Sequence, residues 1–297
     1  IDTARAIEGM PRHASTHAAG VVITEQPVYA YVPLASNDGA LVCQYQMTTL
    51  EELGLLKMDF LGLRNLTVLE DAARRVRRRV PDFQVERIPL DDKKTFDMLA
   101  AGRTVGVFQL ESAGITSVCM GLRPRSIEDI TAVIALYRPG PMESIPRFLA
   151  CSAHPERITY QHPLLEPILA VTYGCIVYQE QVMQIFRELA GFSFGQADNV
   201  RRAMSKKKHA VMEAEREHFV HGCTEPGHEC PGCVANGIPE QVANQIYDEM
   251  SSFASYAFNK SHAACYAYVA FQTAYLKCHY PSQFMAALLT SVLDNTC

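Results

Sequence analysis

The spacing of apolar residues changes near residue 62, and this change constrains the fold more than any other feature of the sequence. After it, apolar side chains recur at helical spacing in segments near 65–79, 93–101, 126–137, 178–190, 196–221, 239–254 and 261–293. Proline and glycine separate these segments, as at Pro81 and Gly191. Before it, two short runs, 19–24 and 53–60, have the composition of strands. The sequence therefore predicts a mainly α protein with a short α/β portion at its N-terminal end.

The run 53–60 would place charged side chains on one face of a strand and apolar side chains on the other. Lys57 and Asp59 share one face, and the apolar side chains of Leu56, Met58 and Phe60 share the other. We therefore expect the charged pair at the surface or in a cleft. A carboxylate there can bind a divalent cation, but two-metal phosphoryl chemistry needs at least two converging carboxylates, and the chain contains no Asp-x-Asp. On these residues alone, Asp59 is better explained as a surface acid.

Composition argues against two broad classes of protein. Of 297 residues, 48% are hydrophobic, which is enough to support a core and argues against intrinsic disorder. No stretch approaches the roughly 18 uninterrupted apolar residues that a membrane span requires. The net charge of −5 means that any contact with nucleic acid must come from local basic patches. The scattered cysteines are typical of reduced thiols in a cytoplasmic protein, and the missing initiator Met leads us to expect a piece of a longer polypeptide.

The most informative stretch is a basic run within the predicted helix 196–221. It contains Arg201, Arg202 and the three lysines 206–208, and no acid lies between Asp198 and Glu213. Because like charges repel, the run suggests an anionic ligand. Phosphate suits it, since arginine binds as a fork and lysine as a point charge. The alternative is an exposed basic face that binds no ligand.

A second polar cluster precedes the long apolar helix predicted after residue 260. Asn259 or Ser261 could cap that helix, which would place Lys260 and His262 near its positive N-terminal end. Two donors there, together with the aromatic ring of Tyr256, suit a phosphate and a base. A helix cap with a structural histidine explains the same residues without a ligand.

Three cysteines, Cys223, Cys230 and Cys233, lie in a loop rich in glycine and proline. Their spacing includes the C-x2-C element of many zinc sites, but a fourth ligand is needed, and His221 or His228 would have to supply it. Loop cysteines without metal are the simpler interpretation, so zinc is retained only as an alternative.

Two other patterns have simple explanations. His13 and His17 lie four residues apart before the first predicted strand, but no third metal ligand lies nearby, so polar residues lining a cleft are the better interpretation. The arginine-rich run 74–79 could contact a nucleic-acid backbone. A solvated helix end at the negative pole of the helix dipole also accounts for it, and we prefer that interpretation.

Several ordered motifs run along nearly the whole chain. They include Gly54-Leu55-Leu56-Lys57-Met58-Asp59-Phe60, Val107-Phe108-Gln109-Leu110-Glu111-Ser112, Tyr137-Arg138-Pro139-Gly140-Pro141, Arg201-Arg202-Ala203-Met204-Ser205 with the lysines that follow, and Phe258-Asn259-Lys260-Ser261-His262. Together they resemble the C-family replicative DNA polymerases of bacteria, specifically the DNA polymerase III alpha subunit family.

The resemblance implies a division into two domains. Residues 1–62 would be the C-terminal part of a palm domain of the polymerase-beta-like nucleotidyltransferase type, and residues 63–297 an incomplete fingers domain. Asp59 matches the third metal-binding aspartate of the palm, which would bind Mg²⁺. Lys57 beside it would face the incoming nucleotide.

The resemblance also implies functions for the basic and polar clusters. Arg201 and Arg202 match the fingers arginines that hold the triphosphate. Tyr256 and His262 match residues that line the nucleotide pocket, and Lys260 lies between them.

The implied activity is the addition of deoxynucleotides to a primer 3′-hydroxyl with two Mg²⁺ ions during chromosome replication. The partners would be primer–template DNA, deoxynucleoside triphosphates and, through regions outside this chain, the sliding clamp and other replicase subunits, in the cytoplasm at the nucleoid. The family's other two catalytic aspartates form an Asp-x-Asp upstream of this chain, so we expect the chain alone to be inactive. The alternative is a non-catalytic nucleic-acid-binding module, stapled by zinc at Cys223, Cys230 and Cys233.

Overall fold

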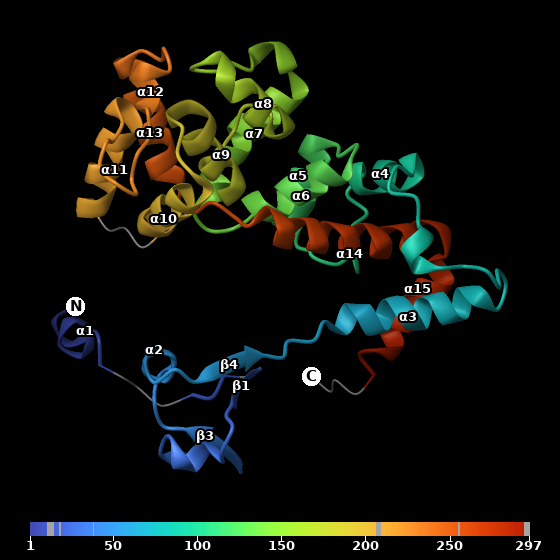
Figure 1. Cartoon of the computed structure of the whole chain (residues 1–297). Helices are drawn as coiled ribbons and strands as arrows, with labels where there is room; N and C mark the ends of the chain where they lie inside the picture. Colours follow the sequence, from blue (N-terminus) through green and yellow to red (C-terminus); the bar gives the residue numbers. More distant parts are fainter. Residues whose placement is uncertain (11–14, 18, 38, 206–208, 255, 294–297) are drawn as a thin grey trace. The chain divides into compact units, whose positions relative to one another are not determined.

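The computed structural model of the chain describes residues 1–10, 15–17, 19–37, 39–205, 209–254 and 256–293. The chain divides into two compact units, Ile1–Arg64 and Asn65–Cys297. Helices dominate and the few strands are short (Figure 1). The predicted fold class, mainly α with a short α/β portion, is therefore confirmed.

The first unit contains the strand pair that carries Asp59. Strand β1 (Gly20–Ile23) runs antiparallel to β4 (Leu56–Asp59), so that Gly20 lies opposite Asp59. Both strands fall inside the runs predicted from the sequence, and each is four residues long.

The remaining elements of this unit were not predicted. Two further strands form a hairpin of their own, and their mixture of Ala, Ser and Asn with few β-branched residues gives no clear strand signal. These elements are α1 (Asp2–Ile7), a 3-10 turn η1 (Val28–Ala30), β2 (Leu34–Asn37), β3 (Ala40–Cys43) and α2 (Met47–Glu52).

The second unit is built from helices. Those expected from apolar periodicity are α3 (Arg64–Arg77), α4 (Lys93–Ala100), α6 (Ile127–Leu136), α9 (Gln179–Ala190), α10 (Phe194–Ser205), α11 (His209–His221), α13 (Glu240–Ala254), α14 (Lys260–His279) and α15 (Pro281–Thr290). The helices not expected are α5 (Ala113–Leu122), α7 (Ile145–Ala153), α8 (Glu166–Leu169) and α12 (Gly232–Ala235). Short 3-10 turns lie at Val85–Arg87, Pro141–Ser144, Pro155–Arg157, Pro163–Leu165 and Ala170–Thr172.

Two predicted helices are each divided in the structure. The segment 261–293 breaks at Tyr280, whose backbone leaves the helical region (φ −133°, ψ 53°) because the following residue is Pro281. Pro281 then opens α15, where its missing N–H is not needed. The segment 196–221 comprises α10 and α11, and its residues 206–208 lie outside the described part of the chain.

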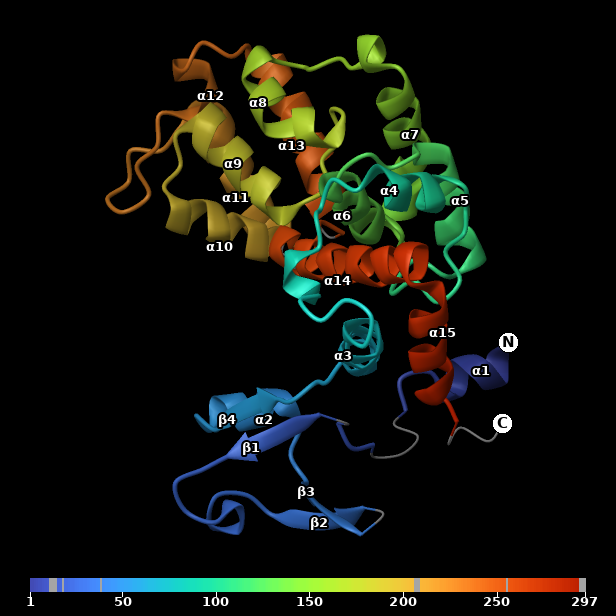
Figure 2. The ribbon, with the colours of Figure 1, turned by 90° about the vertical axis from the view of Figure 1, so that its right-hand side faces the viewer.

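Helix α14 is the centre of the second unit. Its buried alanines let α6 approach closely, and α6 is buried on all sides from Asp129 to Leu136. Helices α9 to α13 form a second apolar cluster beyond the N-terminal end of α14. Helices α3 and α15 lie at its C-terminal end (Figures 1 and 2). The start of α14, where the polar cluster lies, is therefore close to both of the larger clusters.

Candidate functional site

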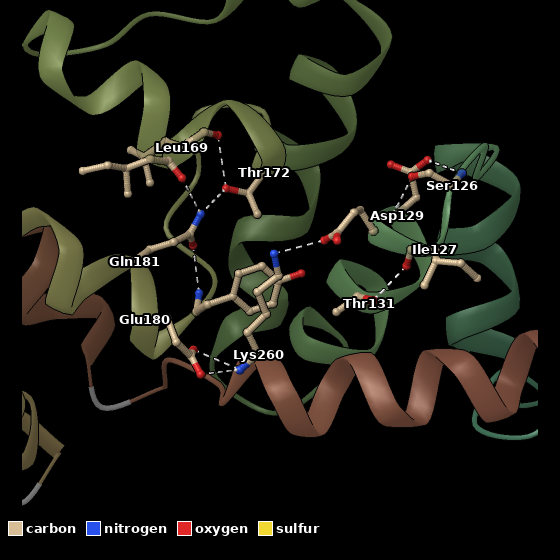
Figure 3. Close-up of polar contacts among 12 residues, drawn as sticks. Ser126, Ile127, Asp129, Thr131, Leu169, Thr172, Glu180, Gln181 and Lys260 are labelled. Atoms are coloured by element: carbon tan, nitrogen blue, oxygen red, sulfur yellow. Dashed lines mark hydrogen bonds and ion pairs between the residues drawn. The ribbon is translucent and has the colours of Figure 1, made fainter. Parts of the chain in front are cut away.

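The segment before α14 is fixed by the start of α9. Phe258 exchanges backbone hydrogen bonds with the strand-like stretch there, accepting from Gln179 (2.9 Å) and donating to the Val177 carbonyl (3.1 Å). The Glu180 carboxylate accepts hydrogen bonds from the backbone N–H of Lys260 at 3.0 and 3.1 Å (Figure 3). These contacts hold the first turn of α14 in one place.

The helix cap is Asn259, one of the two candidates from the sequence. Its side-chain oxygen accepts a hydrogen bond from the His262 N–H at 2.8 Å, and its amide nitrogen donates to Glu180 at 3.1 Å. The predicted N-terminus of the helix is thus confirmed at this residue. The cap orients the first turn so that the His262 ring faces a cavity.

This cavity has a volume of about 590 Å³ and lies between α5, α6, α14 and the loop that precedes α5. Aromatic rings form much of its wall: Phe108, Tyr137, Phe258, His262 and Tyr266. The His262 ring lies 4.2 Å from the ring of Tyr266 and 5.4 Å from that of Phe258, measured between centroids. Such a wall offers flat apolar faces with polar edges, which suits a base or a sugar better than a bare anion.

Arg138 holds one wall of the cavity, and sequence reasoning gave it no role. Its guanidinium lies 4.1 Å from the Phe258 ring centroid and donates to the carbonyls of Ala135 (3.0 Å) and Tyr256 (2.8 Å). Burial lowers the pKa of this guanidinium below its usual value. The signal available in the sequence was the Arg-Pro-Gly-Pro turn that follows a helix whose last five residues are all apolar.

In the same turn, the structure leaves no room for a side chain at Gly140. Its φ of +101° is unfavourable for other residues, and a Cβ atom there would overlap the ring of Tyr256. Tyr256 therefore lies against the turn. It is not among the residues that line the cavity, in contrast to Phe258.

A second hollow, of about 390 Å³, lies on the other side of the same segment and includes Asn259 and Arg201 in its wall. Arg201 donates to one oxygen of Asp198 through Nε (2.9 Å) and Nη2 (2.7 Å), and to Gln179 through Nη1 (3.1 Å). Arg202 binds the other oxygen of Asp198 through Nε at 2.8 Å. Hydrogen bonding from Arg201 lowers the pKa of the Asp198 carboxyl.

The two arginines therefore differ in what they can still bind. The Arg201 side chain is 20% exposed and each of its three nitrogens already donates a hydrogen bond. The Arg202 side chain is 66% exposed and, among the described residues, is paired through Nε only. The sequence argument inferred a ligand from the lack of nearby acids, but Asp198 pairs with both arginines and offsets one of their two positive charges. The lysines 206–208 lie outside the described residues.

Lys260 points away from both hollows. Its Nζ lies 3.3 Å from the Glu128 carboxylate at the start of α6 and 5.5 Å from the ring centroid of Tyr178. In Figure 3 its side chain extends toward α6 from the first turn of α14. Within the described residues, His262 and Lys260 are thus separated onto different sides of one helix turn.

In the first unit, Lys57 and Asp59 form an ion pair with Nζ and Oδ1 2.6 Å apart. The hydrogen bond from Lys57 lowers the pKa of the Asp59 carboxyl. Exposure does not separate the two faces of the strand: the Lys57 side chain is only 17% exposed, while Leu56 and Met58 on the apolar face are 57% and 41% exposed. The Asp59 side chain is 54% exposed, and no described residue pairs with its Oδ2, which could bind a cation.

The cysteine loop does not gather metal ligands. Cys223 and Cys230 form a short antiparallel bridge with two backbone hydrogen bonds of 2.9 Å, and Cys233 is fully buried in the apolar cluster. Burial raises the pKa of the Cys233 thiol to about 12, so it is protonated near neutral pH. No group of three or more His, Cys, Asp or Glu that could hold a metal occurs in the part of the chain that the structure describes. The zinc alternative therefore has no structural support.

The remaining sequence patterns have local explanations. His17 Nδ1 accepts hydrogen bonds from the N–H groups of Ala19 and Gly20, while His13 lies outside the described residues. On α3, Arg74 pairs with Asp71 at 3.2 Å and Arg77 with Glu70 at 2.8 Å, as expected for a solvated helix end.

Among the described residues, no helix has the length and apolar character needed to cross a membrane.

Comparison with known proteins gives two family matches. A model described as the bacterial DNA polymerase III alpha subunit finger domain matches residues 65–227, and one described as the bacterial DNA polymerase III alpha NTPase domain matches residues 1–62. The DNA polymerase III subunit alpha of Staphylococcus epidermidis (strain ATCC 12228) is 47% identical over 295 residues, which is 99% of this chain and 27% of that protein. The Staphylococcus aureus (strain COL) protein of that name is 47% identical over 290 residues, 97% of this chain and 26% of the relative. The chain spans about a quarter of the length of these curated relatives.

Proposed function

Since the chain belongs to the family of the bacterial DNA polymerase III alpha subunit, we propose that it is part of a DNA-directed DNA polymerase whose second unit binds the incoming deoxynucleoside triphosphate. The observation that carries this proposal is the aromatic cavity at the capped start of α14, with His262 in its wall. In this proposal residues 1–62 belong to the palm and residues 63–297 to the fingers.

The two hollows suit different parts of a nucleotide. Phe258 lines the first and its neighbour Asn259 lines the second, so the hollows lie on the two sides of one short segment. The rings of the first would contact the base and sugar, with His262 donating to the sugar or to a phosphate. The exposed Arg202 beside the second would contact the triphosphate, because its two terminal nitrogens have no partner in the part of the chain that the structure describes.

Arg201 and Lys260 would act differently from Arg202. Arg201 is held by Asp198 and Gln179, so it would fix the end of α10 rather than bind phosphate directly. Lys260 would have to leave Glu128 to reach a nucleotide. Tyr256, packed against Gly140, would support the wall that carries Phe258.

A divalent metal is implied by the family, and this chain offers one fitting ligand for it. Asp59 has a carboxylate oxygen free for Mg²⁺, with Lys57 on the other oxygen. Two Mg²⁺ ions, when bound, would stabilise the attacking 3′-oxygen and the leaving oxygen. The chain contains no Asp-x-Asp, and among the described residues no group of three or more His, Cys, Asp or Glu could hold a metal ion, so the chain alone should not extend a primer.

The experiment that tests this proposal replaces Arg202 with alanine in the full-length polymerase. Losing a charge-assisted hydrogen bond to phosphate, about 1.5–3 kcal/mol, should raise the nucleotide KM by roughly 10- to 150-fold. Arg78, an exposed arginine after α3, provides the matched control, and R78A should leave KM unchanged. An unchanged KM in R202A would remove the assignment of the triphosphate to this arginine.

A further inference from the structure

The cavity contains one residue with an unfavourable backbone conformation, Gln109. Its φ is +62°, in the left-handed region, and it occupies the third position of a turn closed by a 3.1 Å hydrogen bond from Leu110 N–H to the Val107 carbonyl. Glycine is the usual residue at such a position because it has no Cβ to clash. A glutamine in this conformation suggests that its side chain has a function.

The turn is fixed on the helix that carries His262. The Phe108 N–H donates to the Thr273 hydroxyl of α14 at 3.0 Å, and the Phe108 ring lies 5.1 Å from that of Tyr266 between centroids. Thr273 is buried, so this anchor is not exchanged with water. Gln109 is therefore presented to the cavity from a firmly held turn.

The Gln109 side chain is exposed, and among the described residues its amide has no hydrogen-bond partner. Around it, the Glu111 carboxylate accepts from the Gly106 N–H at 3.0 Å, and Arg138 is used by the carbonyls of Ala135 and Tyr256. In the described part of the chain, no hydrogen bond of this loop involves the side chain of Gln109, although that side chain lines the cavity. An uncharged amide offers a donor and an acceptor, which suits the edge of a base rather than a phosphate.

We infer that Gln109 is a specificity-determining residue, whose amide donates a hydrogen bond to the base of the nucleotide bound in the cavity. This inference rests on the proposed function. A template-directed enzyme must accept four bases. A single amide can therefore bind all of them only at an edge where all four present the same hydrogen-bonding group. That place is the minor-groove edge, where purine N3 and pyrimidine O2 both present acceptors. Gln109 thus senses whether the base sits in correct pair geometry, and not which base it is.

The first test uses Q109G in the full-length polymerase, because glycine removes the amide and also relieves the backbone. We expect Tm to be unchanged or higher, while kcat/KM for correct insertion falls about 2- to 10-fold for all four nucleotides, as for one hydrogen bond. Misinsertion should fall less, so discrimination against mispairs decreases. Q109N tolerates the same backbone but is shorter, and it should show the same loss with an amide still present.

A nucleotide analogue tests which atom of the base accepts the hydrogen bond from Gln109. In 3-deaza-2′-deoxyguanosine triphosphate a C–H replaces the N3 acceptor, so the wild-type enzyme should lose the same several-fold in kcat/KM relative to dGTP. The Q109G enzyme should show no further loss with the analogue. Additive losses, or a loss in Q109G confined to one of the four bases, would overturn the inference.

Failure of the inference can be separated from failure of the proposed function by H262A. If H262A impairs nucleotide binding while Q109G and the analogue have no effect, the cavity binds nucleotide and Gln109 does not contact the base. If H262A and R202A also leave insertion unchanged, the proposed function itself is wrong. If Q109G lowers Tm in parallel with activity, the residue is structural and the inference is overturned.

Discussion

Replacing Arg138 with alanine should loosen the segment that carries Phe258 and His262. The guanidinium donates to two carbonyls, at 3.0 and 2.8 Å, and lies 4.1 Å from the Phe258 ring centroid. A hydrogen bond from a charged donor is worth about 1.5–3 kcal/mol and a partly buried cation–π contact about 1 kcal/mol. Because the freed Ala135 carbonyl lies at a helix end and can be hydrated, we expect a net loss of roughly 3 kcal/mol.

The loss should be local, so the assay is hydrogen exchange in the full-length polymerase. A change of about 3 kcal/mol corresponds to a roughly hundredfold higher population of the open segment, and exchange in peptides covering 177–181 and 256–263 should accelerate accordingly. The variant R138K keeps the charge without the planar fork and should give an intermediate effect.

The control and the refutation use distant parts of the same molecule. R78A removes an exposed arginine and should change exchange nowhere near α14. In R138A, α7 (Ile145–Ala153) should keep its native exchange, since the partners of the Arg138 guanidinium are Ala135, Tyr256 and Phe258, which lie outside α7. If the 256–263 peptide exchanges at the wild-type rate in R138A, the idea that this side chain holds the cavity wall is wrong.

Two further variants test the turn and the metal ligand. G140A should destabilise the same segment by about 2 kcal/mol, from the positive φ and the overlap with Tyr256, whereas G195A, at an open position in α10, should be neutral or slightly stabilising; equal effects would contradict the steric argument. D59N in the full-length polymerase should abolish primer extension while leaving nucleotide affinity within a few-fold of wild type, measured by extension over a Mg²⁺ titration; retained extension would show that Asp59 does not bind the metal.

The fold was predictable where packing follows a repeating pattern. Helices such as α3 and α9 have one apolar stripe, and periodicity located both. Helix α5 (Ala113–Leu122) has two glycines, no charged residue and no clear polar face, so periodicity gave no signal. The β2–β3 hairpin was missed because its strands are only four residues long with mixed composition.

The site could be predicted only where its contacts join residues that are close together in the sequence. The Asn259 cap depends on residues three apart, so the sequence contained the necessary information. Asp198 precedes Arg201 and Arg202 by three and four residues, a spacing that predicts helical ion pairs, and this signal was present but unused. Arg138 and Gln109 act across long sequence separations, through α14, and neither composition nor spacing indicates such contacts.

The ion pairs of the site change how its phosphate chemistry should be understood. Each described lysine and arginine that the sequence assigned to a nucleotide already has a carboxylate partner: Lys57 has Asp59, Arg201 and Arg202 share Asp198, and Lys260 has Glu128. These partners offset the mutual repulsion that crowded cations would otherwise add to the folded state.

A polyphosphate entering such a site exchanges one anion for another, so its net gain is smaller than the cation count implies. The gain is largest for a cation that can bind phosphate without leaving its carboxylate. Arg202 meets this condition, because Asp198 binds its Nε and leaves the four donors of the two terminal nitrogens, whereas the three donors of Lys260 share one nitrogen that lies 3.3 Å from Glu128. Charge alone would rank these two residues equally, and it is the number of free donors that places Arg202 first.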